Sequence, residues 1–562
     1  MRSRIILLAF VAWLTGFSAL AMQDVRAQSS GSTQQKEDTQ SLVVPGQIAP
    51  RLQNLGDHTH PITTSSPRAQ LFFNQGLNLG YGFNHREALR SFQEAARLDP
   101  ECAMAYWGQA LVLGPNINMP MVSEDEPKAY ELVQKGMVLR SKAGERERAY
   151  IEALAMRYSG DPADRAERDR AYAEAMKKLA KRYPDDLDAA TLYAEALMDL
   201  QPWNYWAKDG HPYKSTLEIV SVLESVLERN PDHPGANHLY IHAVEAINPA
   251  LAEAAADRLR HLMPGAGHMV HMPSHIYIRV GRYHDASDTN VRAIAADEDY
   301  ITQCRAQGIY PLGYYPHNVH FLWAAATMEG RSRVAIEAAR KTASRIPEDK
   351  WDELPSWAQP FRIVPLFALT RFGKWDEILQ EPRPAGSGFA LGIWHYARGM
   401  ALARTSGFDE AAAELESLRA LAAEKELAKQ MVAANTVGDI LAIAAETVAG
   451  ELAAEQGKGE EALSHLHRAV LLQDGLTYTE PPDWHYPVRQ SLGAVLLQAG
   501  RAREAEVVYW QDLEGNPDNG WSLFGLLESL RAQGKMDQAA EIEKRFEKAW
   551  ARADVKLSAS RF

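Results

Sequence analysis

Apolar and small residues recur along the chain at the spacing expected for paired helices. Residues 69–100, AQLFFNQGLNLGYGFNHREALRSFQEAARLDP, place apolar side chains three and four positions apart, which predicts helices with one buried face. Gly76 and Ala88 are small enough to let two antiparallel helices approach closely. Phe92 is placed to fill the space beside them, and Pro100 to end the second helix. The segment therefore predicts one helical hairpin.

The same spacing returns in further segments. Clear copies are marked by Gly281, Tyr283, Ala286 and Ala293, by Gly330, Ala335 and Pro347, and by Gly493, Gly500, Ala505, Tyr509 and Pro517. Weaker copies end at Pro184, Pro231 and Pro264 or surround Gly373, Gly407, Gly459 and Gly534. This recurrence resembles the tetratricopeptide repeat family over roughly residues 67–552. The resemblance implies an all-α fold, an α-solenoid of about ten helical hairpins in a superhelical array.

Length and composition agree with such an array. A chain of 562 residues exceeds the ~250–300 residues that one hydrophobic core supports. Ala, Leu, Glu, Arg and Lys dominate, which favours helices. We divide the chain into a signal peptide at 1–27, a disordered leader or arm at 28–66, an N-terminal array at 67–347 and a C-terminal array at 348–562.

The N-terminus has the pattern of a targeting segment. Arg2 and Arg4 precede the apolar residues 5–20, and small residues ending at Ala21 and Ala27 offer two cleavage sites. The pattern predicts a secretory signal peptide and an exported protein, either periplasmic or secreted. A retained membrane anchor is the alternative, but the apolar stretch is short for a bilayer span. No later apolar run is long enough, so we expect no membrane span after cleavage.

Charge and cysteine content exclude two other classes. The formal net charge of −13 argues against a nucleic-acid partner, which requires basic patches. Cys102 and Cys304 lie far apart in sequence, and a solenoid brings only neighbouring repeats together. We expect two free, mostly buried thiols rather than a disulfide framework.

Histidines concentrate in the middle of the chain and share positions within successive repeats. Of the 18 histidines, ten lie between His233 and His320. The second repeat position holds His268 and His317, the fifth holds His238, His271 and His320, and the ninth holds His242 and His275. The resemblance implies that these positions line the concave groove in which tetratricopeptide arrays bind ligands.

The spacing of these histidines predicts a metal site. His238, His242 and Glu245 share one helix face, and helices of adjacent repeats stack ~8–10 Å apart. Imidazoles at equivalent positions can then converge on one ion. We predict a transition-metal ion, zinc or copper, with the ligand candidates His238, His242, His268, His271, His275, His317, His320 and Glu245. Met269 and Met272 interleave the histidines and admit copper, although core packing is the favoured role for both.

Two prolines bear on the geometry of this site. Proline is tolerated only in the first turn of a helix, so we expect a helix to begin near Pro273, with His268 and His271 on the preceding loop. Pro316 likewise predicts a helix that begins just before His317.

The sequence leaves the function open between two classes. One is a metal-binding or metal-dependent protein, in which a hydrolase or oxidase is conceivable and Glu245 or Glu195 is the candidate general base. The other is a metal-free scaffold of the cell envelope that binds a protein or peptide partner in its groove. No phosphate-binding loop, nucleophile elbow or HExxH motif is present, and nothing identifies a substrate.

Two segments outside the repeats contain residues that could belong to a binding site. His58 and His60 lie two positions apart in the arm and could fold into the groove as ligands, although a disordered linker is the favoured interpretation. Residues 201–214, QPWNYWAKDGHPYK, break the repeat pattern. They predict either part of a binding face or a hydrophobic cap over a loose joint.

Overall fold

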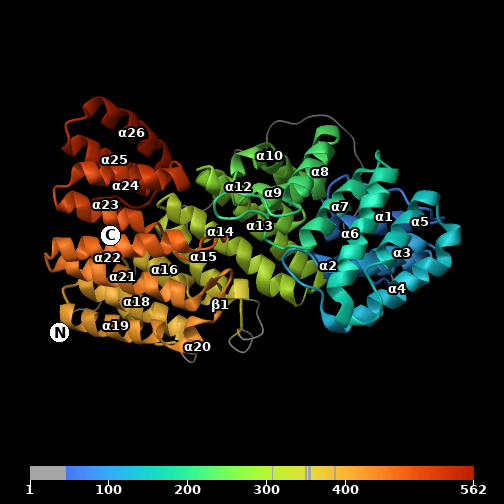
Figure 1. Ribbon diagram of the computed structural model, residues 1–562, viewed down its shortest axis with the longest axis horizontal. Helices are drawn as coiled ribbons and strands as arrows, with labels where there is room; N and C mark the ends of the chain where they lie inside the picture. The colour runs from blue at the N-terminus through green and yellow to red at the C-terminus, as the bar shows by residue number, and fades with distance from the viewer. Residues whose placement is uncertain (1–45, 307, 348–350, 352–355, 385–387) are drawn as a thin grey trace, which may run out of the picture. The chain divides into compact units, whose positions relative to one another are not determined.

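The computed structural model describes residues 46–562 except 307, 348–350, 352–355 and 385–387, and these residues are mainly helical (Figure 1). Each helix packs against the next along the chain, so that successive helices form hairpins. The described residues contain twelve such hairpins, against about ten expected: α1/α2, α3/α4, α5/α6, α7/α8, α9/α10, α12/α13, α14/α15, α16/α17, α18/α19, α21/α22, α23/α24 and α25/α26. The all-α array of tetratricopeptide-like hairpins is therefore confirmed.

The first helices are α1 (Pro67–Tyr81), α2 (His85–Leu98), α3 (Ala103–Leu111), α4 (Glu126–Leu139), α5 (Glu145–Ala155), α6 (Arg165–Arg182), α7 (Leu187–Asp199), α8 (Thr216–Arg229), α9 (Pro234–Val244), α10 (Glu253–Leu262), α11 (Gly267–His271), α12 (Pro273–Arg279) and α13 (Tyr283–Cys304). They are followed by α14 (Tyr315–Met328), α15 (Ser332–Ser344), α16 (Val364–Arg371), α17 (Trp375–Gln380), α18 (Gly388–Arg404), α19 (Phe408–Ala422), α20 (Lys425–Ala428), α21 (Val437–Glu455), α22 (Gly459–Gly475), α23 (Val488–Gln498), α24 (Ala502–Gly515), α25 (Gly520–Ala532) and α26 (Met536–Ala549). A short antiparallel pair, β1 (Met431–Val432) and β2 (Asn435–Thr436), precedes α21.

The small residues of the repeat pattern are required by close packing. A Cβ atom added at Gly76 would lie 2.8 Å from the ring of Phe92, and one added at Gly108 would lie 2.4 Å from the same ring. Both separations are far below van der Waals contact, so only glycine fits at these two positions. Phe92 thus fills the space between the first two hairpins, as its position in the sequence predicts.

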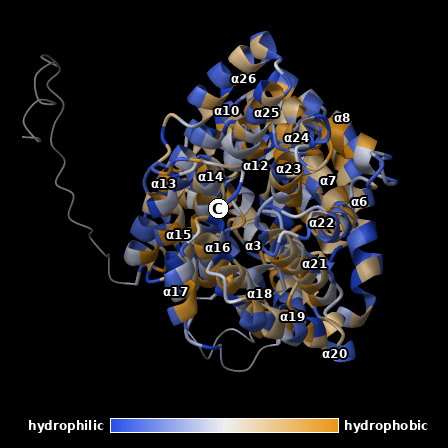
Figure 2. Cartoon of the chain, turned by 90° about the vertical axis from the view of Figure 1, so that its left-hand side faces the viewer, coloured by the Kyte–Doolittle hydropathy of each residue, from blue (hydrophilic) through white to orange (hydrophobic). Residues whose placement is uncertain are grey.

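The helices present apolar residues on one side and polar residues on the other, and Figure 2 shows both kinds on the same helices. Their apolar sides form two main cores, one running from Ala49 to Ala325 and the other from Ile294 to Ile542. The two cores meet within α13 and α14, and residues 47–562 form one compact unit. The division into arrays at residue 347 stays a prediction.

Contacts also join the middle of the chain to its C-terminal hairpins. The loop between α22 and α23 brings Glu480 Oε2 within 3.0 Å of His275 Nδ1 on α12. The indole of Trp521 on α25 donates a hydrogen bond of 2.9 Å to the carbonyl of Thr327 on α14. These residues are far apart in sequence, so the array is not connected through neighbouring repeats alone.

The arm before α1 differs from the sequence-based expectation of disorder. The amide of Ile48 donates to Glu94 Oε2 at 2.9 Å, and the amide of Leu52 donates to Gln75 Oε1 at 2.9 Å. His60 is 7% exposed and contacts α7. The expectation of a disordered arm is therefore wrong for residues 47–66, which hydrogen-bond to the first hairpins. Residues 1–45, including the expected signal peptide, lie outside the described residues.

Two smaller expectations can be compared with the described residues. Cys102 and Cys304 are free and buried, as expected, and burial raises the pKa of the Cys102 thiol to about 11. Within the part of the chain described above, no helix combines the length and apolar character that crossing a bilayer requires.

Candidate metal centre

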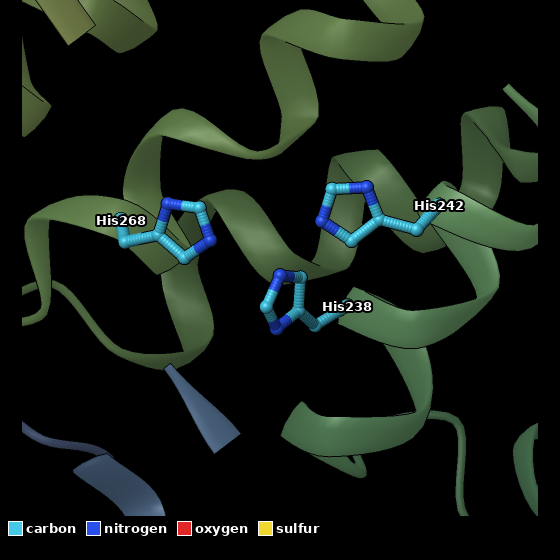
Figure 3. Close-up of side chains that lie close together, drawn as sticks. All are labelled: His238, His242 and His268. Atoms are coloured by element: carbon cyan, nitrogen blue, oxygen red, sulfur yellow. The ribbon is translucent and has the colours of Figure 1, made fainter. Parts of the chain in front are cut away.

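Three histidines from α9 and from the short helix α11 face one another in the interior. His238 and His242 lie on α9, and His268 lies on the short helix α11. One ring nitrogen of each lies within 4.8 Å of the other two, and Figure 3 shows the three rings turned toward one another. The residues are at most 2% exposed. We call this group the first triad.

Hydrogen bonds determine which nitrogens of the first triad carry protons. Nδ1 of His238 lies 2.6 Å from the backbone oxygen of Tyr81, and Nδ1 of His242 lies 3.0 Å from Glu245 Oε1. Carbonyl and ionised carboxylate oxygens only accept, so in the neutral rings both Nδ1 atoms donate and both Nε2 atoms expose a lone pair. Those Nε2 atoms and both ring nitrogens of His268 are buried without a hydrogen-bond partner among the described residues.

Burial keeps the rings of the first triad neutral. It lowers the pKa of His238 and of His268 well below the ordinary value, and neighbouring imidazoles lower both further. Burial also lowers the pKa of His242, although Glu245 partly opposes this. Neutral imidazole is the form that binds a metal ion, so no proton has to be removed near pH 7.

Two aromatic residues in unusual backbone conformations cover the first triad. Phe83 has φ 55° and Trp203 has φ 63°, the left-handed region that large side chains rarely adopt. The Phe83 ring lies 4.5 Å from that of His238, and the Trp203 ring meets that of His242 edge-on at 5.1 Å. Such conformations cost about 1–3 kcal/mol each and concentrate at functional sites. Trp203 belongs to the loop 201–214, which therefore covers α9 beside the triad.

A second group of three histidines lies next to the first. One ring nitrogen each of His271, His275 and His317 falls within 4.8 Å of the others. Nε2 of His271 is 3.0 Å from Nε2 of His275, and Nδ1 of His271 is 2.7 Å from Asn290 Oδ1. His317 is half-buried on α14, whereas His271 and His275 are buried. We call this group the second triad.

Glu245 contacts both triads. Its Oε1 accepts from His242, and its Oε2 lies 2.7 Å from Nδ1 of His275. Glu245 is 1% exposed, and burial alone would raise its pKa, yet His275 and His242 lower it. A single ionised carboxylate thus orients one ring from each triad, which is the usual role of a carboxylate behind a metal-bound histidine.

His275 faces a second carboxylate. Glu480 Oε2 lies 3.0 Å from the same Nδ1, and Glu480 is also buried. Burial would lower the pKa of His275, but Glu245 and Glu480 raise it to about 9. Burial raises the pKa of Glu480. Arg279 is the nearby cation, 3.9 Å from Glu480 Oε1.

The structure keeps two of the sequence candidates away from both triads. His320 is buried, but its ring stacks on Trp323 at 5.0 Å and meets Phe361 edge-on at 5.3 Å. It belongs to none of the groups whose ligand atoms come together among the described residues. Glu195 is half-buried, and desolvation together with the neighbouring Asp199 raises its pKa to about 8.

The arm histidines form a separate hydrogen-bonded cluster around Asp188. Asp188 Oδ1 lies 2.9 Å from His58 Nε2 and 3.2 Å from His233 Nε2, Asp188 Oδ2 lies 2.8 Å from His60 Nδ1, and the Tyr81 hydroxyl donates to Oδ1 at 2.5 Å. The cluster lines a cavity of about 960 Å³. His233 Nδ1 accepts the amide of Ala236 and caps α9, so its Nε2 must donate to Asp188. No lone pair of His233 remains for a metal ion, and the cluster attaches the arm to α7.

Helix boundaries near the prolines agree with the sequence in part. α12 begins at Pro273 and α14 begins at Tyr315, just before His317, as expected. His268 and His271 lie on a short helix, α11, rather than on a loop. The chain stays helical at Met272 with φ −50° and ψ −37°, so both rings keep the direction that a helix gives them.

Three partners of the histidines were not identified from the sequence. The backbone carbonyl of Tyr81 carries no side-chain signal, and Asn290 lies on α13, whose polar positions resemble an exposed helix face. Glu480 lies in TYTEPPDWHYP, a segment rich in proline and aromatic residues between two repeats. That departure from the repeat pattern is the one signal that marks it.

Comparisons with known proteins add little beyond the fold. No model of a protein family and no curated protein matches the chain. Similar solved structures include the human IFIT1 dimer with m7Gppp-AAAA, with 13% identity over 87% of this chain and 91% of that chain and a TM-score of 0.31. Others are yeast Tom70, with 12% identity over 87% and 92% and a TM-score of 0.29, and the TPR domain of P58(IPK), with 13% identity over 84% and 99% and a TM-score of 0.22. Likenesses this remote indicate nothing about ligands.

Proposed function

We propose that this protein is a metal-binding protein built on a tetratricopeptide-like array, and that the first triad binds one transition-metal ion, zinc or copper. The observation that carries the proposal is the convergence of buried ring nitrogens from His238, His242 and His268 for which the described residues offer no hydrogen-bond partner. An unpaired buried polar atom costs about 1–3 kcal/mol. A single metal ion can accept the lone pairs of all three ring nitrogens and so remove this cost.

The donor set matches zinc or copper. Imidazole suits both ions, and a site of three imidazoles leaves a fourth tetrahedral position for water or another ligand. The Tyr81 carbonyl and Glu245 accept the Nδ1 protons of His238 and His242, which fixes the tautomer that directs Nε2 inward. The first triad contains neither cysteine nor carboxylate ligands, so a thiolate cage and a hard-cation site are both poor fits.

The burial of the triad favours a metal ion over a peptide ligand. A groove that binds a peptide must present its polar side chains at the surface, whereas these three residues are at most 2% exposed. The histidines are therefore assigned to a metal ion.

The proposal includes export. The basic and apolar pattern of residues 1–27 supports secretion, and zinc or copper would then be bound outside the cytoplasm. The site is assigned to binding alone. Glu245, the candidate base nearest the triad, is already engaged by His242 and His275.

Elemental analysis of protein purified without a histidine tag tests the proposal. We expect zinc or copper to copurify, and the double variant His238→Ala/His242→Ala to lose the ion of the first triad while keeping its helical circular dichroism. Wild-type protein loaded with cobalt(II) should show the visible absorption of a low-symmetry site. In the variant, the part of this absorption that comes from cobalt at the first triad should be absent.

A matched control is His320→Phe, because His320 is buried on aromatic neighbours and lies outside both triads. This variant should keep the full metal content. The proposal fails if wild-type protein exposed to zinc and to copper retains neither ion after gel filtration, or if the double variant binds as much metal as the wild type.

A further inference from the structure

We propose that the second triad binds a second metal ion and that Glu245 couples the two sites into one two-ion centre. The inference rests on the proposed function, because the first triad is the partner of this coupling. Its basis is geometric: His271, His275 and His317 bring three ring nitrogens together, directly beside the first triad.

The ring arrangement of the second triad requires a cation between its members. Asn290 Oδ1 accepts from Nδ1 of His271, and Glu245 accepts from Nδ1 of His275, so without a metal ion it is the proton of His275 that lies between the two Nε2 atoms, which are 3.0 Å apart. Two lone pairs at that distance repel unless a positive charge lies between them. A proton satisfies two nitrogens, whereas a metal ion also accounts for the third ring, His317.

The separation of the nitrogens is right for a shared ion. Imidazole nitrogens bind zinc at ~2.0–2.1 Å, so two ligands of one ion lie ~3–3.4 Å apart for angles between a right angle and the tetrahedral angle. The 3.0 Å between His271 and His275 falls in this range.

The charges around the second triad also call for a cation. Glu245 and Glu480 bury two carboxylates within 3.0 Å of one imidazole nitrogen, and Arg279 is the nearby cationic side chain. Glu480 Oε2 is shielded from solvent and lies against the same Nδ1 of His275 that donates to Glu245. Buried charges are stable only when they are paired or coordinate a metal, and a dication at the three histidines can replace the proton of His275 as the positive partner of these carboxylates.

Glu245 links the two ions. Its two oxygens accept from His242 of the first triad and from His275 of the second. A carboxylate between two dications lowers their mutual repulsion and strengthens both imidazole ligands. One substitution at this position should therefore weaken both sites together, which no ligand of a single triad can do.

Zinc binding to the full-length mature protein, freed of metal with a chelator, tests the inference. We expect two zinc ions per chain by calorimetry and by elemental analysis after gel filtration. His271→Ala/His317→Asn should leave one ion, and His238→Ala/His242→Ala should leave the other. Glu245→Gln should lower the affinity of both sites roughly 10–100-fold, because an amide oxygen accepts from one ring while its NH₂ group opposes the second Nδ1–H.

A matched control is Glu414→Gln, since Glu414 accepts from His395 at 2.5 Å in a distant hairpin. It should change neither stoichiometry nor affinity, and circular dichroism should show every variant folded. One ion in the wild type that is lost in His238→Ala/His242→Ala but kept in His271→Ala/His317→Asn overturns the second site and leaves the proposed function intact. No zinc in any protein overturns both, and a Glu245→Gln effect limited to one site overturns the coupling.

Discussion

The backbone oxygen of Tyr81 lies 2.6 Å from Nδ1 of His238, although 157 positions separate the two residues. The end of α1 therefore sets the tautomer of a candidate metal ligand on α9. The hydroxyl of the same Tyr81 donates to Asp188. One residue thus connects the first triad with the cluster that attaches the arm to α7.

Metal removal should lower thermal stability. An ion that binds the folded chain alone stabilises it by about 2.7 kcal/mol when its free concentration is 100 times Kd. We expect a chelator to lower the Tm of the wild type, and His238→Ala/His242→Ala to remove part of that shift. Differential scanning fluorimetry with and without zinc measures it. An identical chelator shift in both proteins would contradict a role for the first triad.

Trp203→Gly should open a path to the first triad. Trp203 is 46% exposed and covers His242, and glycine accepts its left-handed backbone without strain. We expect a competing chelator to extract the ion faster, with unchanged stoichiometry. Trp510→Ala is the control, since Trp510 is 42% exposed on α24, away from the triad. Equal extraction rates in all three proteins would show that Trp203 is not the cover.

Asp188→Asn should loosen the arm. The carboxylate accepts from His58, His60, His233 and Tyr81, and an amide leaves at least one of these donors unpaired. Breaking a buried charged network of this kind costs about 3–5 kcal/mol. We expect limited proteolysis to cut the arm in the variant but not in the wild type. Unchanged protection would mean that other contacts of the arm hold it.

The stability of the docked arm should decrease both at low pH and at higher pH. Asp188 accounts for the decrease at low pH. Burial alone would raise the pKa of Asp188, but hydrogen bonds from His233, His58 and His60 hold it well below its usual value. The stability that this carboxylate contributes is therefore complete above its unfolded pKa of ~3.9, and is lost as pH falls toward the folded pKa.

His60 behaves in the opposite sense. Burial lowers its pKa, but the Asp188 carboxylate outweighs this and raises it above the ordinary value. Its contribution is complete below ~6.5 and is lost as pH rises through the folded pKa. Hydrogen-exchange protection of residues 52–60, measured relative to the unstructured exchange rate at each pH, should be greatest between pH ~4 and ~6.5, and Asp188→Asn should flatten this profile. A flat wild-type profile would contradict the assignment.

Export can be checked by sequencing the mature N-terminus. The two small-residue sites predict that the exported protein begins at Met22 or Gln28. The measurement is N-terminal sequencing of protein recovered outside the cytoplasm. Intact Met1 in soluble cytoplasmic protein would overturn the signal-peptide prediction.

The positions of the histidines within the repeats predicted much of the candidate site. Histidines at equivalent positions on successive helices do lie on adjoining surfaces, because hairpins of similar length stack in register. His238 and His242 therefore meet His268, and His271 and His275 meet His317. The sequence combined them in one pocket, but Glu245 lies where the two groups adjoin, and each group gathers three rings.

Side-chain rotamers and long-range packing set contacts that a repeat pattern does not encode. His320 occupies a repeat position equivalent to that of His238, yet its ring lies flat on Trp323 of its own helix. Glu480 reaches His275 only because a loop between later hairpins returns to α12. Neither repeat spacing nor helix periodicity describes such a return.

That returning loop changes how the chain should respond to force and heat. In an array whose hairpins contact only their neighbours, unfolding can begin at either end and proceed one repeat at a time. Here Glu480 contacts His275, and Trp521 hydrogen-bonds to Thr327 across 194 positions, so these contacts link both ends of the intervening segment. We therefore do not expect its hairpins to unfold one at a time. Under a pulling force, the chain should stay folded until these two contacts break, and many repeats should then unfold together.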